Sequence, residues 1–103
     1  MNNHEQHAVE RYLRNKNYKI VATDEEFDFV CEDDTNLVFI NVSVSHVTEE
    51  EKIDRANIEM KAINWLANND SHTDMPIRFD TIILVPLGNK AFVKHHINAL
   101  GRV

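Results

Sequence analysis

The chain has 103 residues, enough for one hydrophobic core, and we expect a single domain over residues 1–103 with no room for a second. No apolar run is long enough for a signal peptide or a membrane span, so we expect a cytoplasmic protein without a membrane partner. The formal net charge of −6 excludes a general coat for nucleic acid, because such binding draws mainly on Lys and Arg contacts to phosphates.

The first predicted element is a helix over about residues 4–17. Its apolar residues share one stripe at helical spacing: Ala8, Val9, Tyr12 and Leu13. Asn17 can end this helix, because asparagine tolerates the left-handed backbone conformation that is common just beyond a helix end. His4 and His7 lie three residues apart, but no third metal ligand accompanies them, so we expect a frayed terminus and no metal there.

Three strands are predicted next, over about residues 18–22, 26–31 and 37–44. A polar turn joins the last two, and we expect the three strands to form an antiparallel meander. In the second strand we expect Phe27 and Phe29 on one face. Cys31 cannot form an internal disulfide, since it is the single cysteine, and we expect an ordinary buried thiol.

The third strand carries the residues that matter most for function. Side chains alternate between the two faces of a strand. One face should hold Phe39, Asn41 and Ser43, and the other should hold Val38, Ile40, Val42 and Val44.

A second helix of about twenty residues is predicted to begin at Thr48, because Thr48 and Glu51 form a capping box. Its wide apolar stripe includes Trp65, which we expect in the core or an interface. The nearly continuous apolar run 79–85 predicts a strand covered on both faces and closed by Pro86. Since a helix crossover leads to this strand, we expect it to run parallel to the strand 37–44 with a right-handed connection.

A short edge strand at 91–94 and a helical turn at 96–100 are predicted to complete the chain. His95 and His96 are adjacent, so we do not expect them to point the same way from a regular strand or to share a metal. The predicted order is αβββαβ with a small tail, which indicates an α/β fold with a mixed sheet flanked by two helices.

Short pieces of the sequence, in this order, resemble one known family. They are Glu5 with Ala8, Tyr12-Leu13, Tyr18, Glu26 to Val30, Leu37 to Ser43, Ala62, Trp65-Leu66 and Arg78 to Asp80. The chain resembles the YraN-type family, small bacterial proteins similar to archaeal Holliday-junction resolvases, from Glu5 to about Ala99. The resemblance implies the restriction-endonuclease-like fold.

The resemblance also implies a metal-dependent endonuclease. In that family, carboxylates at the positions of Asp28 and Asn41 would hold Mg²⁺, and a lysine at the position of Ser43 would stabilise charge on the phosphate. This chain has a neutral amide at Asn41 and an uncharged hydroxyl at Ser43. We therefore expect a degenerate, inactive site whose remaining acidic groups are Asp28, the one candidate metal ligand, with Glu26 and a vestigial Glu5.

Three functions follow from this sequence. The first is a nuclease-fold protein without catalytic activity and without a cofactor, which binds nucleic acid or another protein. The second is a Mg²⁺-dependent, structure-specific DNA endonuclease with a rearranged site built on Asp28, Glu26 and Glu5. The third is a structural or regulatory homo-oligomer, such as a homodimer, formed through a sheet edge or through the helix that carries Trp65.

Basic residues gather near both ends of an otherwise acidic chain. They are Arg11, Arg14, Lys16 and Lys19, then Lys90, Lys94, His95, His96 and Arg102. These residues are either solvated surface charges or local contacts for phosphate groups.

Overall fold

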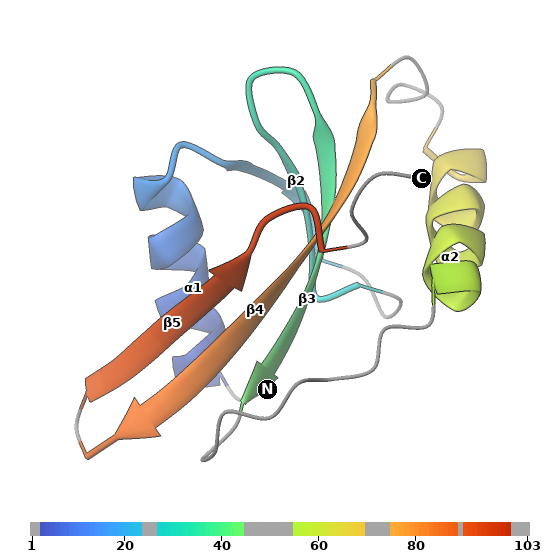
Figure 1. Ribbon diagram of the computed structural model, residues 1–103. Helices are drawn as coiled ribbons and strands as arrows, with labels where there is room; N and C mark the ends of the chain where they lie inside the picture. Colours follow the sequence, from blue (N-terminus) through green and yellow to red (C-terminus); the bar gives the residue numbers. More distant parts are fainter. Residues whose placement is uncertain (1–2, 24–26, 45–54, 70–74, 89, 100–103) are drawn as a thin grey trace.

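The computed structural model describes residues 3–23, 27–44, 55–69, 75–88 and 90–99. Within them the chain forms two helices and five strands in the order α1, β1, β2, β3, α2, β4, β5 (Figure 1). This is the predicted α/β order, with a mixed sheet and two helices. No helix in the described part of the chain is long and apolar enough to cross a membrane.

The strands lie in the sheet in their sequence order. Their bounds are β1 Lys19–Ala22, β2 Phe29–Glu32, β3 Leu37–Val44, β4 Ile77–Leu87 and β5 Lys90–His96. Strands β1, β2 and β3 form the predicted antiparallel meander, β4 runs parallel to β3, and β5 returns antiparallel to β4. The parallel pair is the central one, because the crossover through α2 returns the chain to the sheet beside β3.

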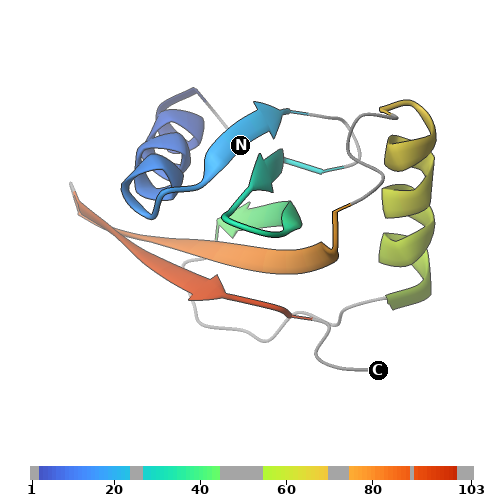
Figure 2. The same cartoon turned by 90° about the horizontal axis from the view of Figure 1, so that it is seen from above.

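The two helices cover opposite faces of the sheet (Figure 2). Helix α1 (Asn3–Asn15) packs against the sheet through Val9 and Leu13. The hydrophobic core between α1 and the sheet also includes Phe29, Cys31, Val38, Ile40 and Ile82. Helix α2 (Arg55–Ala67) packs through Ile58, Ala62 and Trp65, and its core includes Phe27, Val30, Leu37, Phe39 and Phe79. Alternate residues of β3 therefore belong to alternate cores, as the period of a strand requires.

The predicted end of the first helix is confirmed. Helix α1 ends at Asn15, and Asn17 has a φ of 64°, in the left-handed region. The N–H of Tyr18 then donates to the carbonyl of Leu13 at 3.0 Å, which satisfies one of the carbonyls that a helix end leaves open. The predicted start of the second helix at Thr48 lies outside the described residues. The described part of α2 begins at Arg55.

The predicted placement of Phe27 and Phe29 on one face is wrong. Phe27 packs in the core under α2, whereas Phe29 packs in the core under α1. The reason is that the chain bends at Asp28 and the regular strand β2 begins only at Phe29, so the alternation of a strand does not extend back to Phe27.

The predicted end of the fourth strand at Pro86 is also wrong, since β4 continues to Leu87 and Pro86 pairs with Ala91. Within the described residues the β3–β4 ladder ends at Leu84, so Pro86 interrupts none of the β3–β4 pairs that the structure describes. Strand β5 is correspondingly longer than predicted, because the hairpin through Gly88 keeps both strands in register.

The predicted helical turn at 96–100 does not form within the described residues. His96 is the last residue of β5, and Asn98 has a φ of 57°, which a continuing right-handed helix excludes. The N–H of Ala99 donates instead to the carbonyl of Phe79 at 2.7 Å, which ties the C-terminal segment to β4.

Candidate functional site

Asn41 and Ser43, which the sequence analysis predicts to be degenerate site positions, lie near the C-terminal end of β3. Phe39 of the same strand packs under α2, so alternation places both Asn41 and Ser43 on the α2 side of the sheet. Both side chains are half-buried, in contrast to the fully buried start of the strand. The predicted sharing of a face by Phe39, Asn41 and Ser43 therefore agrees with the packing.

Asp28 approaches the same part of β3. Its Oδ2 atom accepts a hydrogen bond from the backbone N–H of Val42 at 2.6 Å, and Val42 lies between Asn41 and Ser43. The register of β2 and β3 places Phe29 opposite Ile40, so Asp28 stands at the end of that ladder, beside Asn41. The structure thus brings Asp28, Asn41 and Ser43 to one place, with the carboxylate bonded to the backbone.

These three residues offer a metal ion such as Mg²⁺ a single carboxylate, that of Asp28. Asp28 has one oxygen engaged by Val42, and Asn41 is the neutral neighbour, whereas Mg²⁺ takes carboxylates in a near-octahedral arrangement. Among the described residues, no three His, Cys, Asp or Glu side chains gather in a way that could hold a metal ion. Glu26 lies outside the described residues.

Glu5 lies in the first turn of α1 and is half-buried. A negative charge at this position is favoured by the helix dipole, so the helix itself accounts for an acidic residue there. The ancestral site role of Glu5 stays a prediction.

A pocket of about 360 Å³ opens beside α2, next to the start of β4. Its lining is mainly apolar and includes Ile58, Ile63 and Ile77, with Arg55 and Glu59 from the helix. Asp28, Asn41 and Ser43 are not among its lining residues. The pocket therefore belongs to the helix–sheet junction and not to the predicted site around Asn41 and Ser43.

Asp80 is not among the predicted site residues, yet its carboxylate is the centre of the largest polar network among the residues that the structure describes. Asp80 is 0% exposed. Its oxygens accept hydrogen bonds from Nε of Arg78 at 2.9 Å, from the backbone N–H of Asn98 at 2.8 Å and from the hydroxyl of Tyr18 at 3.3 Å. His95 Nε2 lies 2.8 Å from Oδ2 of the same carboxylate, so a buried charge is paired on several sides.

Arg78 extends this network to the turn between β2 and β3. Its Nη1 atom donates to Oδ2 of Asp33 at 2.5 Å, and its Nη2 atom donates to the hydroxyl of Tyr18 at 2.5 Å. Asp33 also accepts the backbone N–H groups of Thr35 and Asn36, which fixes the turn. One guanidinium therefore joins β4, the segment after α1 and the β2–β3 turn.

The pKa values of the network follow from these contacts. Burial alone would raise the pKa of Asp80, but the hydrogen bonds from His95 and Arg78 outweigh it and hold that pKa below its usual range. Burial raises the pKa of Tyr18 to about 12, with the charge of Asp80 acting in the same direction. Asp80 is thus held ionised and Tyr18 neutral at pH 7.

The sequence signal for this network was an Arg and an Asp two residues apart in a strand that is otherwise nearly continuous in apolar residues. Residues i and i+2 share a strand face, so Arg78 and Asp80 had to meet. Nothing in the sequence placed Tyr18, Asp33 or His95 beside them.

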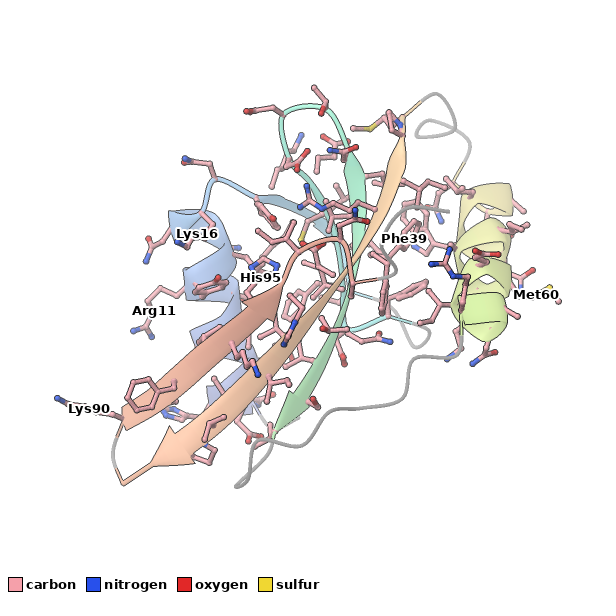
Figure 3. All side chains as sticks on the ribbon, in the orientation of Figure 1. Arg11, Lys16, Phe39, Met60, Lys90 and His95 are labelled. Atoms are coloured by element: carbon pink, nitrogen blue, oxygen red, sulfur yellow. The ribbon has the colours of Figure 1, made fainter. Side chains whose placement is uncertain are left out.

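The predicted basic residues separate into two groups in space. Arg11, Arg14 and Lys16 are exposed on or just after α1, and Arg11 and Lys16 are labelled there in Figure 3. Lys90, Lys94 and His96 are exposed along β5, whereas His95 turns toward α1, where its Nδ1 atom lies 3.0 Å from the hydroxyl of Tyr12. The prediction that His95 and His96 point in different directions is confirmed, and Arg102 lies outside the described residues.

Cys31 and Trp65 lie where the sequence predicted. Cys31 is buried in the core under α1, and burial raises the pKa of its thiol to about 12, so the nucleophilic thiolate is scarce at neutral pH. Trp65 is buried in the core under α2 and meets Phe39 edge to face, with ring centroids 5.6 Å apart.

Comparison with known proteins adds one relative. No family model matches the chain. A protein of Syntrophomonas wolfei described as a UPF0102 protein is 33% identical over 101 aligned positions, which cover 86% of this chain and 87% of that protein. The similarity therefore extends over nearly the whole of both chains.

Proposed function

The chain belongs to the UPF0102 family, the YraN type of nuclease-fold protein, and from this membership we propose that it binds nucleic acid without cutting it. The observation that carries the proposal is the neutral site on β3. Asp28 is bonded to the backbone of Val42, and its neighbours on that strand are Asn41 and Ser43. A scaffold that keeps its fold but has neutral side chains where a nuclease needs charges can still present a binding surface.

The size of the catalytic loss supports this choice. Removing one preorganised electrostatic group from an active site costs on the order of 10²–10³ in rate. Here both a carboxylate ligand, at Asn41, and a cation, at Ser43, are absent from the positions that the family resemblance assigns to them. Hydrolysis by the usual metal-assisted route then has neither its metal site nor its phosphate-stabilising charge.

The alternative, an endonuclease with a rearranged site, needs Asp28 to serve as a metal ligand with Glu26 and Glu5. Against it stands the hydrogen bond that Asp28 already accepts from Val42. A further role for Asp28 would require its carboxylate to leave that bond or to use its second oxygen alone.

A direct binding measurement tests the proposal. Fluorescence anisotropy with labelled single-stranded, duplex and branched DNA, in EDTA and low salt, should report binding whose affinity falls steeply as salt is added, because phosphate contacts release counterions. Absence of binding to all three DNAs at low salt would refute nucleic-acid binding and leave a protein partner as the ligand of the scaffold. Light scattering on the same samples separates a monomer from the homo-oligomer of the third hypothesis.

A further inference from the structure

Strand β5 presents two different faces. Val93 packs in the core under α1, and His95 is bonded to Asp80 and lies beside Tyr12 of α1. The alternate residues therefore face the other side of the sheet. We call this row the β5 strip, and it consists of Lys90, Phe92, Lys94 and His96.

The β5 strip is exposed and is chemically unusual for a sheet surface. Each of its four side chains is exposed, and Phe92 is 64% exposed. The strip interleaves two lysines and a histidine with one aromatic ring, although the chain as a whole carries a net charge of −6. Positive charge is therefore concentrated locally, with an accessible aromatic face between the two lysines.

The strip lies on the same face of the sheet as the degenerate site. The register pairs Ser43 with Ile83 and Ile83 with Lys94. It likewise pairs Asn41 with Thr81 and Thr81 with His96. Two strand spacings amount to about 10 Å, so the cations of β5 lie across one intervening strand from the two neutral positions of β3.

Helix α2 does not reach the strip. Its core lies over Phe39 and Phe79, near the start of β3 and β4. The β4–β5 hairpin runs away from this helix, toward the end of the hairpin where Lys90 is labelled (Figure 1, Figure 3). A ligand on the strip would thus lie on the sheet itself, beside the site and clear of the helix.

From these observations we infer that the β5 strip is the nucleic-acid contact surface and that its ligand is single-stranded. The inference rests on the proposed function and names the surface and the ligand class. Lysines contact phosphates, and an exposed aromatic ring stacks on a base, which is how proteins hold single strands without reading their sequence. A duplex offers the phosphates but keeps its bases stacked inside, so it leaves Phe92 without a partner.

Lysines on an edge strand also discourage unwanted pairing with other chains. That role explains Lys90 and Lys94. It gives no reason for Phe92 between them, because a phenylalanine that is 64% exposed itself favours association with other chains. Charge complementarity with a polyanion accounts for the lysines and the ring together.

The test compares charge removal on two surfaces of the full chain. Lys90→Gln with Lys94→Gln removes two charges from the strip, and Arg11→Gln with Arg14→Gln removes two exposed charges from α1 as the matched control. The probe is fluorescein-labelled oligo-dT of fifteen nucleotides, with a hairpin duplex of equal charge for comparison. Circular dichroism checks that each variant is folded.

Log affinity falls linearly with log salt, and we expect the strip variant to make this slope shallower by about 0.7 for each lysine removed. The α1 variant should leave the slope unchanged. Phe92→Ala should weaken oligo-dT binding by about 5- to 100-fold and duplex binding much less. Equal losses in the two charge variants, or unchanged oligo-dT affinity in Phe92→Ala, would overturn the strip as the contact surface.

Two further outcomes separate this inference from its premise, and a third would overturn the inference alone. If the wild-type chain binds no nucleic acid at low salt, the proposed function fails and the strip fails with it. If the wild-type chain binds but the strip variants bind equally well, only the strip fails. A homodimer in analytical ultracentrifugation that Phe92→Ala converts to a monomer would assign the strip to self-association and overturn the inference.

Discussion

The imidazole of His95 on β5 is held by the buried carboxylate of Asp80 on β4, with Nε2 and Oδ2 2.8 Å apart. An ionised carboxylate only accepts, so Nε2 carries the proton of this bond. In the neutral imidazole Nδ1 then accepts from the hydroxyl of Tyr12 at 3.0 Å. One histidine thereby joins α1 to both strands of the hairpin that carries the β5 strip.

Removing the charge of Asp80 should destabilise the fold strongly. Asp80→Asn keeps the shape of the side chain but leaves Arg78 and the surrounding donors without their counter-charge, and breaking a buried ion pair in this way costs about 3–5 kcal/mol. Urea unfolding measures the loss. Asp34→Asn, at an exposed aspartate of the β2–β3 turn, is the control and should change the unfolding free energy by less than about 0.5 kcal/mol. Equal stability of Asp80→Asn and wild type would contradict the network as described.

Acid should weaken the fold through the same carboxylates. The pKa values of Asp80 and Asp33 are lowered in the folded state, so at low pH the unfolded chain takes up protons first. Their contribution is present above the ordinary aspartate pKa of about 3.9 and is lost as pH falls below it toward the folded-state values. Unfolding free energies are measured between pH 7 and pH 2.5. In the wild type they should decrease once the pH is lower than about 4, and in Asp80→Asn this decrease should be smaller. If Asp80→Asn lost as much unfolding free energy at low pH as the wild type, other titrating groups would be responsible for the loss.

Alkali should weaken the fold through Tyr18. Burial raises the pKa of Tyr18 to about 12, so the folded state keeps the phenolic proton after the unfolded chain has lost it. The contribution of Tyr18 is present below its ordinary pKa of about 10 and is lost as pH rises from there toward 12. Tyr18→Phe should unfold with a shallower loss of stability between pH 9 and pH 11 than wild type. Some loss of stability should remain in Tyr18→Phe, because burial also raises the pKa of the Cys31 thiol.

The turn after α1 provides a test of backbone conformation alone. Asn17 has a φ of 64°, a conformation that costs a residue with a Cβ atom roughly 1–2 kcal/mol unless its side chain is suited to it. Asn17→Ala should therefore lower the unfolding free energy by about 1 kcal/mol, while Asn17→Gly should be close to neutral. Thermal unfolding of the two variants gives the comparison. An alanine variant as stable as the glycine variant would mean that the turn adopts another conformation in solution.

The order of the elements could be predicted because each has a local signal. The period of apolar residues marked α1 and β3, and Asn17 marked the end of the first helix by a residue-specific conformational preference. Errors arose where tertiary context overrides a local rule. Phe27 left the predicted face because the chain bends at Asp28, and Pro86 stayed inside β4 because pairing with β5 continues past it to Leu87.

The candidate site could be predicted only in part, for a physical reason. Asn41 and Ser43 share one strand, so their common face follows from alternation alone. The Asp80 network draws its members from α1, the segment after it, the β2–β3 turn and the β4–β5 hairpin. Such a convergence depends on the three-dimensional register of the sheet, and one sequence gives no pattern for it beyond the charge of Arg78 and Asp80 in an apolar strand.

The central claim is that this member of the UPF0102 family keeps the nuclease scaffold without nuclease chemistry. The measurement that tests it most directly is cleavage of labelled single-stranded and branched DNA in Mg²⁺ and in Mn²⁺ by the wild-type chain and by Asp28→Ala, with folding of both checked by circular dichroism. We predict that neither chain cuts above the rate of a buffer control in either metal. Metal-dependent cleavage by the wild type that is abolished in Asp28→Ala would contradict the claim and establish a rearranged active site.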